Sequence, residues 1–245
     1  MTARPAGLVE SAMLRMFTRK AEVLDVEQVG PAFCIVTLGG EALRGFDWTP
    51  GDKIQLHLGN WLQRTYTPMD WDGHAGRTRI LVYRHAADGP GARWMRTVRP
   101  GDPCVVLGPR KSVRLAGPPS PVLLFGDETS LGLAAALRDQ LAPPALRLSL
   151  DLLLEASSQA DVHPVLQRLG LDGARVCVRQ PDDAHFAALE QQFAQALQAH
   201  ARTDVVLTGK AGSIQHLNRF LRRQNRTEGR LQAKAYWAVG KTGLD

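Results

Sequence analysis

The sequence has few cysteines, no long apolar segment and no glycine-rich nucleotide fingerprint. Its three cysteines, Cys34, Cys104 and Cys177, stand some 70 residues apart, without a CxxC pair or a nearby histidine cluster. A protein-ligated iron–sulfur cluster or metal ion is therefore not expected. No run approaches the roughly 18 apolar residues of a membrane-spanning helix. Residues 1–19 carry charges where a secretory signal would be apolar. We expect a cytoplasmic protein without membrane insertion.

Positive charge is in excess, with a formal net charge of +6 and a pI near 9.6. Such an excess attracts anionic partners. The basic residues are dispersed apart from the run at 219–226, and no nucleic-acid recognition motif is present. Nucleic acid is therefore not the expected partner, and a small anionic substrate explains the charge as economically.

The first half of the chain predicts strands separated by turns, after a short amphipathic helix at residues 8–19. Six short strands favour a closed or nearly closed antiparallel barrel. One helix is expected near residues 91–98. The predicted strands are 21–29, 33–38, 53–58, 64–71, 77–84 and 103–107.

The pattern changes after the proline-rich stretch 117–121, which we interpret as a linker between domains 1–117 and 118–245. Strands and helices then alternate, which favours an open parallel α/β sheet. The predicted strands are 122–125, 146–155, 175–179, 204–208 and 231–237. The predicted helices run to residue 140 and over 162–169, 184–199 and 214–223.

The segment Arg64-Thr65-Tyr66-Thr67 lies between two alternating apolar runs. Successive side chains of a strand point to opposite faces, so Arg64 and Tyr66 project together. A guanidinium suits a phosphate, and an adjacent aromatic ring suits a flat head group. An ordinary strand tyrosine beside a solvated arginine is the alternative.

The turn at residues 88–92 enters the predicted helix of the first half. Unpaired N–H groups at a helix start, together with Gly89 and Gly91, form an anion site suited to a pyrophosphate. His85 ends the preceding strand. An ordinary Gly-Pro turn and a structural histidine are the alternatives.

The turn Gly126-Asp127-Glu128-Thr129-Ser130 follows the first strand of the second half, where a dinucleotide meets an open sheet. GxGxxG is absent, and the carboxylates of Asp127 and Glu128 repel a phosphate placed directly above them. Helix capping by Thr129 or Ser130 is the simpler interpretation of this turn.

Taken together, these motifs resemble the siderophore-interacting protein family, the flavin-dependent ferric-siderophore reductases, from about residue 18 to the end. Two-domain flavin reductases place a flavin-binding barrel before a sheet that holds the nicotinamide donor. The motifs that carry the resemblance are Arg64-Thr65-Tyr66-Thr67, His85 with Gly89-Pro90 and Trp94, Gly108-Pro109-Arg110, Gly126-Asp127-Glu128-Thr129, and Tyr236-Trp237 with Gly240-Lys241.

The resemblance implies FAD as cofactor and NAD(P)H as donor. Arg64 is then expected at the FAD phosphates, Tyr66 on the isoalloxazine and Thr67 at the hydrogen-bonding edge of that ring. The turn after residue 125 would face the nicotinamide. The implied cofactor-binding residues are Arg64, Thr65, Tyr66, Thr67, His85, Gly89, Gly91, Ala92, Trp94, Gly126, Asp127, Glu128, Thr129, Tyr236 and Trp237.

The implied reaction is hydride transfer from NAD(P)H to FAD, followed by single-electron reduction of a chelated Fe(III), which releases the iron from its siderophore. Since the cofactor does the redox chemistry, no catalytic acid or base is expected. Candidate residues for binding the anionic ferric siderophore are Lys53, Lys111, Lys210, Lys234 and Lys241. Arg179 and Lys210, which we expect at the ends of neighbouring strands, suggest a pocket for the 2′-phosphate of NADPH.

Three positions depart from the family pattern. Gly91-Ala92 replaces a turn with a small hydroxyl residue, Pro68-Met69-Asp70 stands where a second arginine is common, and Gly209-Lys210 replaces Gly-Glu. These departures leave donor and substrate open. The alternatives are a related flavoprotein reductase with another acceptor or a ferredoxin donor, or a non-enzymatic module that binds an anion.

Overall fold

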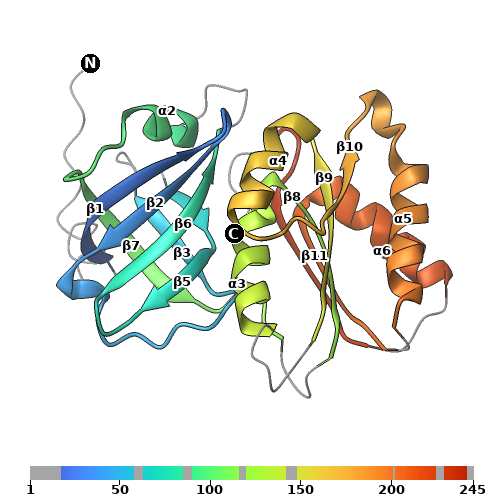
Figure 1. The fold of residues 1–245 in the computed structure, drawn as a ribbon, viewed down its shortest axis with the longest axis horizontal. Helices are drawn as coiled ribbons and strands as arrows, with labels where there is room; N and C mark the ends of the chain where they lie inside the picture. The colour runs from blue at the N-terminus through green and yellow to red at the C-terminus, as the bar shows by residue number, and fades with distance from the viewer. Residues whose placement is uncertain are drawn as a thin grey trace.

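The computed structural model describes residues 18–57, 63–84, 90–115, 120–141, 148–200, 202–224 and 229–241. They form an antiparallel sheet followed by a parallel α/β sheet (Figure 1). Residues 8–17 of the predicted first helix and 117–119 of the predicted linker lie outside the described residues. Thr18 and Arg19, predicted as the end of that helix, instead begin a strand.

The first sheet has seven strands in the order β4-β3-β7-β1-β2-β6-β5. Helix α2 (Pro90–Thr97) lies between β6 and β7 in the chain, as predicted. The strands are β1 (Thr18–Val29), β2 (Phe33–Gly39), β3 (Lys53–His57), β4 (Gln63–Tyr66), β5 (Pro68–Asp72), β6 (Arg77–Tyr83) and β7 (Pro103–Arg110).

One predicted strand, 64–71, is divided at Thr67 into β4 and β5. Pro68 has no backbone N–H to donate to a ladder. β4 pairs with β3 and β5 with β6, so these two consecutive strands form the opposite edges of the sheet. The prediction of six strands was wrong at this point. Among the described residues, each strand pairs with the next in this order, and the two edge strands, β4 and β5, do not pair with each other.

Alternation along β2 gives the first sheet two buried faces. Cys34, Val36 and Leu38 pack inside the sheet with residues such as Ile54 of β3. Residues on the other face, including Phe33 and Ile35, pack against helix α3. Because successive side chains of a strand point to opposite faces, alternate residues of β2 pack into two different hydrophobic cores.

The second sheet has the order β10-β9-β8-β11-β12, and neighbouring strands of this sheet pair in parallel. Its strands are β8 (Val122–Asp127), β9 (Leu150–Ala156), β10 (Arg175–Val178), β11 (Asp204–Lys210) and β12 (Leu231–Trp237). The helices are α3 (Leu131–Leu141), α4 (Gln159–Arg168), α5 (Phe186–Gln198) and α6 (Ala211–Arg223).

Strand β8 is fully buried and separates two layers of helices. Val122 and Leu124 face the core that contains α3 and α4, whereas Leu123 and Phe125 face α5 and α6. The chain proceeds outward from β8 to β9 and β10 on one side, then returns to β11 and β12 on the other. The point of reversal lies between β8 and β11, which is where ligands bind in open α/β sheets.

Helix α3 stands between the two sheets (Figure 1) and contacts β5 and β6. At its second residue, Gly132, an added Cβ would lie 2.9 Å from the carbonyl oxygen of Thr67. The close approach of helix and strand therefore depends on a residue without a side chain. No helix among the described residues is long and apolar enough to cross a membrane.

Candidate functional site

Arg64 and Tyr66 project together toward the start of helix α2, as their spacing predicted. A Cβ built on Gly91 would lie 3.6 Å from Cγ of Arg64 and 3.7 Å from the hydroxyl of Tyr66. Arg64 donates from Nη1 to the carbonyl of Gln63 at 2.8 Å. The positive start of a helix, an arginine and an aromatic ring are thus assembled in one place.

The aromatic part of this group is Tyr66 with Trp94 of α2, whose ring centroids are 6.5 Å apart. Burial raises the pKa of Tyr66 above its ordinary value, so the phenol stays neutral. Ala92 is buried beside them at 2% exposure. His85 and Gly89, two further predicted cofactor residues, lie outside the described residues.

Thr65 faces away from Arg64 and is exposed. Its hydroxyl accepts from Nε2 of Gln55 at 3.5 Å, and Gln55 in turn accepts from Arg110. Thr67 points toward the other sheet, where its side chain hydrogen-bonds the hydroxyl of Tyr236 in β12. Burial raises the pKa of Tyr236 to about 12, although the bond with Thr67 acts the other way. Thr67 and Tyr236 therefore link the two sheets.

The turn after β8 caps a short helix, but through Asp127 rather than the predicted Thr129 or Ser130. Asp127 accepts from the backbone N–H and the hydroxyl of Thr129, and the backbone N–H of Asp127 donates in turn to the hydroxyl oxygen of Ser130. This reciprocal pattern is a capping box. Gly126 permits it, because an added Cβ would lie 2.4 Å from that of Ser130.

Asp127 is also the point where β8, β11 and β12 meet. Trp237 donates from its indole N–H to Oδ2 of Asp127 at 2.6 Å. Gly209, at a φ of 98°, passes so close that an added Cβ would lie 2.5 Å from the carboxyl carbon. Burial raises the pKa of Asp127 to about 6, while the bonds from Thr129 and Trp237 lower it.

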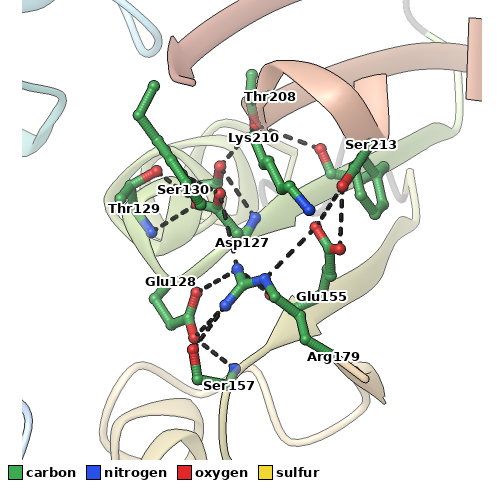
Figure 2. Close-up of polar contacts among 12 residues, drawn as sticks. Asp127, Glu128, Thr129, Ser130, Glu155, Ser157, Arg179, Thr208, Lys210 and Ser213 are labelled. Atoms are coloured by element: carbon green, nitrogen blue, oxygen red, sulfur yellow. Dashed lines mark hydrogen bonds and ion pairs between the residues drawn. The ribbon is translucent and has the colours of Figure 1, made fainter. Parts of the chain in front are cut away.

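Arg179, directly after β10, lies among the carboxylates at the carboxyl ends of β8 and β9 (Figure 2). Nη1 and Nη2 donate to the two oxygens of Glu128 at 3.0 and 2.6 Å. Nη1 also donates to the hydroxyl of Ser157 at 2.7 Å, and Nη2 to the carbonyl of Glu155 at 3.0 Å. Planar, two-pronged pairing of this kind is the strongest form of side-chain ion pair.

Behind Arg179 lies a buried group that the sequence did not reveal. Glu155 accepts from Ser213 at 2.8 Å and pairs with Nε2 of His185 at 2.7 Å. His185 Nδ1 accepts from the amide of Gln180 at 3.2 Å, which places the ring proton on Nε2. Glu155, directly after the apolar run Leu152-Leu153-Leu154, is the one sequence signal of this group. The three side chains are almost fully buried, so they position Arg179 rather than meet a ligand.

The five predicted substrate lysines fall on two sheets. Lys53 is in β3, in register with Arg110 and so near Lys111, which is exposed after β7. Lys234 is in β12, and Lys241 is exposed beyond it. Lys210 ends β11 and pairs with Asp183 at 2.8 Å. Lys53 and Lys111 therefore belong to the first sheet, and the other three lysines belong to the second.

Arg179 and Lys210 do not end neighbouring strands, so that prediction was wrong. β10 and β11 are separated by β9 and β8 in the sheet. Both side chains are held by carboxylates, Arg179 by Glu128 and Lys210 by Asp183. No group of three or more potential metal ligands occurs among the described residues.

An antiparallel sheet followed by a parallel five-stranded α/β sheet defines the ferredoxin-reductase-like fold. The structure of phthalate dioxygenase reductase, described as a modular structure for electron transfer from pyridine nucleotides to [2Fe-2S], matches 91% of this chain and 70% of its own, with a TM-score of 0.72 and 15% identity. At that identity the match shows the fold alone.

Two family models match the sequence in succession. The siderophore-interacting FAD-binding domain covers residues 59–113, and the siderophore-interacting protein model covers residues 119–240. The chain belongs to the siderophore-interacting protein family. A siderophore utilization protein from T. fusca shares its fold with a TM-score of 0.69 and 25% identity over 93% of this chain and 95% of the other.

A curated relative is the mycobactin import ATP-binding/permease protein IrtA of Mycolicibacterium smegmatis, which is 27% identical over 185 residues, or 73% of this chain. The chain spans 20% of the length of that relative and 8% of the Mycobacterium tuberculosis protein of the same name. The likeness is therefore to one part of a longer protein.

Proposed function

We propose that this protein is a flavin-dependent ferric-siderophore reductase that takes its electrons from NAD(P)H. The observation that carries the proposal is the convergence of Arg64 and Tyr66 on the start of helix α2 at Gly91. Family membership supplies the substrate class. The first and second sheets correspond to the proposed FAD and donor parts, residues 1–117 and 118–245.

The residues present suit FAD. Arg64 supplies a fixed positive charge for the pyrophosphate, and Gly91 leaves the α2 backbone open beside the aliphatic part of the Arg64 side chain. Tyr66 and Trp94 supply a neutral aromatic surface for a flat ring. The missing hydroxyl at Gly91-Ala92 leaves backbone N–H groups as phosphate donors there.

The chemistry supplied by bound FAD is acceptance of a hydride from the nicotinamide and delivery of single electrons to chelated Fe(III). The protein's own part is to bind and orient. Thr67 and Tyr236 hold the two sheets together beside the proposed flavin, and the turn 126–129 lies where the donor approaches. The lysines named above are proposed to attract the anionic chelate, with Lys53 and Lys111 on the flavin-binding sheet.

The first test is the absorbance spectrum of the purified protein with added FAD. We expect a bound flavin, and replacement of Arg64 by alanine should weaken FAD binding by at least about tenfold, because charge-assisted bonds to phosphate are strong. Arg77→Ala, which removes an exposed arginine of β6, is the matched control. Protein that takes up no flavin would overturn the proposal. Equal binding by both variants would remove Arg64 from the site.

The second test separates donors and acceptors. Steady-state reduction of several ferric chelates is measured with NADH, NADPH and reduced ferredoxin. Reduction by a nicotinamide supports the proposal. Reduction by ferredoxin alone would replace the donor, and failure with every ferric chelate would replace the acceptor.

A further inference from the structure

The part of the protein that we propose holds the donor contains a largely buried ion pair between Arg179 and Glu128. In open α/β sheets a dinucleotide lies outside the carboxyl ends of the strands at the point where strand order reverses, here between β8 and β11. The two donors differ only by the 2′-phosphate of NADPH, which an arginine accommodates and an acidic group disfavours. The charges of this edge therefore bear directly on donor choice.

Arg179 is the cation that a 2′-phosphate would need, but its accessible N–H donors are already used. Four N–H bonds run from Nη1 and Nη2 to Glu128, Ser157 and the Glu155 carbonyl. A guanidinium has five N–H donors. The fifth, on Nε, has no hydrogen-bond partner, but it is buried, with Glu155 Oε2 at 3.7 Å. No accessible donor of Arg179 therefore remains for an incoming phosphate.

The pair formed by Arg179 and Glu128 is charged on both sides. Burial opposes ionisation of Glu128, but the bonds and charge of Arg179 outweigh it and keep the pKa of the carboxyl below its ordinary value. Burial also opposes the charge of Arg179, and Glu128 outweighs it in the same way, which raises the pKa of the guanidinium. Release of Arg179 would leave a buried carboxylate unpaired, which is costly.

The second cation of the edge is neutralised too. Lys210 is paired with Asp183 at 2.8 Å, and its side chain is 15% exposed. Asp182 and Asp183 have positive φ values of 53° and 56°, a conformation that few residues besides glycine, asparagine and aspartate adopt. The loop after β10 places the carboxylate of Asp183 at the end of β11, where it meets Lys210.

Carboxylates thus outnumber cations at the ends of β8 to β11. Asp127 ends β8, Glu128 follows it, and Glu155 lies in β9, with Arg179 and Lys210 beside them (Figure 2). Asp182 and Asp183 follow β10 in the chain. A 2′-phosphate adds about −1.5 to −2 charges at neutral pH. It would meet both repulsion and cations that are already paired.

We propose that Glu128, by holding Arg179 through two hydrogen bonds, makes the donor site selective for NADH against NADPH. This inference rests on the proposed nicotinamide donor. Glu128 is then a specificity-determining residue that acts through Arg179, and Asp183 has the same effect through Lys210. The substrate distinguished is a dinucleotide with a free ribose 2′-hydroxyl.

Dissociation constants for NAD⁺ and NADP⁺, measured by calorimetry on the full chain, test the pair without turnover. We expect the wild-type protein to bind NAD⁺ at least about tenfold more tightly, which corresponds to ~1.4 kcal/mol. The backbone N–H of Ser157 also donates to Oε1 of Glu128 at 2.6 Å. Glu128→Gln keeps an oxygen for that bond but removes the charge, so the preference should fall by about tenfold. Asp183→Asn, at an exposed side chain that threatens the fold less, should shift it in the same direction.

Glu27→Gln is the matched control. It removes one negative charge from a pair between β1 and the last residue of α4, Arg168, and should leave the preference unchanged. Binding of NADP⁺ as tight as that of NAD⁺ in the wild-type protein would overturn the inference. So would an unchanged preference in both Glu128→Gln and Asp183→Asn.

Bleaching of the flavin absorbance by NADH and NADPH in the absence of oxygen tests two things separately: that a nicotinamide is the donor, and that NADH is preferred to NADPH. Faster bleaching by NADH supports both. Equal bleaching by the two nucleotides overturns the inference and leaves the proposed donor class standing. Bleaching by neither overturns the donor class and the inference with it.

Discussion

Trp237 of the last strand donates its indole N–H to the buried carboxylate of Asp127 in the first turn of the second sheet, over 2.6 Å. The two residues are 110 positions apart in the chain, yet they meet where strand order reverses. The guanidinium of Arg179 also lies 5.9 Å from the indole ring centroid. Strand β12 is thus hydrogen-bonded to the edge of the second sheet that we propose faces the donor.

Replacement of Trp237 by phenylalanine removes that bond and should lower the free energy of unfolding by about 2 kcal/mol at pH 8, since bonds to charged acceptors contribute roughly 1.5–3 kcal/mol. Urea unfolding provides the measurement. Trp71→Phe is the matched control, because Trp71 donates to the neutral carbonyl of Leu43 at 3.3 Å. Its loss should be about 1 kcal/mol. A larger loss in the control would show that indole packing, and not the bond to Asp127, holds Trp237.

The titration of Asp127 should give stability a distinct pH dependence. Its pKa is raised from 3.8 to about 6 in the folded protein, so between those values the folded state binds a proton that the unfolded state lacks. Stability contributed by this group is therefore greatest at low pH and falls as pH rises through about 6. The shift corresponds to roughly 3 kcal/mol.

Comparison with Asp127→Asn isolates the effect. Free energies of unfolding are measured in urea at intervals from pH 4 to pH 7 for both proteins. The wild-type protein should lose up to about 3 kcal/mol relative to the variant over that range. The absolute stability of the variant is not the readout, because asparagine presents a donor where Trp237 also donates. Parallel curves would show that Asp127 titrates normally.

Periodicity and turn residues were sufficient to predict both sheets and the order of their elements. The predicted strand 122–125 is confirmed as part of β8, and its continuously apolar sequence fits a strand that is buried on both faces. The division at Thr67 was not predicted, since alternation continues through Pro68 while the pairing partner changes from β3 to β6. Edge changes of this kind depend on the curvature of the whole sheet, and local sequence does not encode them.

The candidate site was predictable only in its local parts. Arg64 and Tyr66 lie on one face because their spacing within a strand requires it. Arg179 was predicted as a phosphate ligand, but it is held by Glu128, 51 positions away in the chain. Residue types on separate strands do not reveal which carboxylate an arginine will meet. Such pairings follow from strand order, which the sequence left open.

Gly132 tests how closely helix α3 must approach the first sheet. It is the second residue of α3, and Gly212 is the second residue of α6, so alanine should favour the helix at both positions by roughly 0.5–1 kcal/mol. At Gly212 an added Cβ meets only Cε of Lys210 at 3.7 Å, an ordinary contact. Gly212→Ala should therefore raise the free energy of unfolding.

At Gly132 the same change should reverse sign, because the Cβ would lie 2.9 Å from the carbonyl oxygen of Thr67 and the backbone must shift. We expect Gly132→Ala to lower the free energy of unfolding by about 1–3 kcal/mol, as overpacking does in a well-packed core. The displaced Thr67 also bonds Tyr236, so FAD affinity should fall in Gly132→Ala and not in Gly212→Ala. Stabilisation by both substitutions would mean that α3 and Thr67 separate easily, and that their contact does not set the position of the proposed flavin.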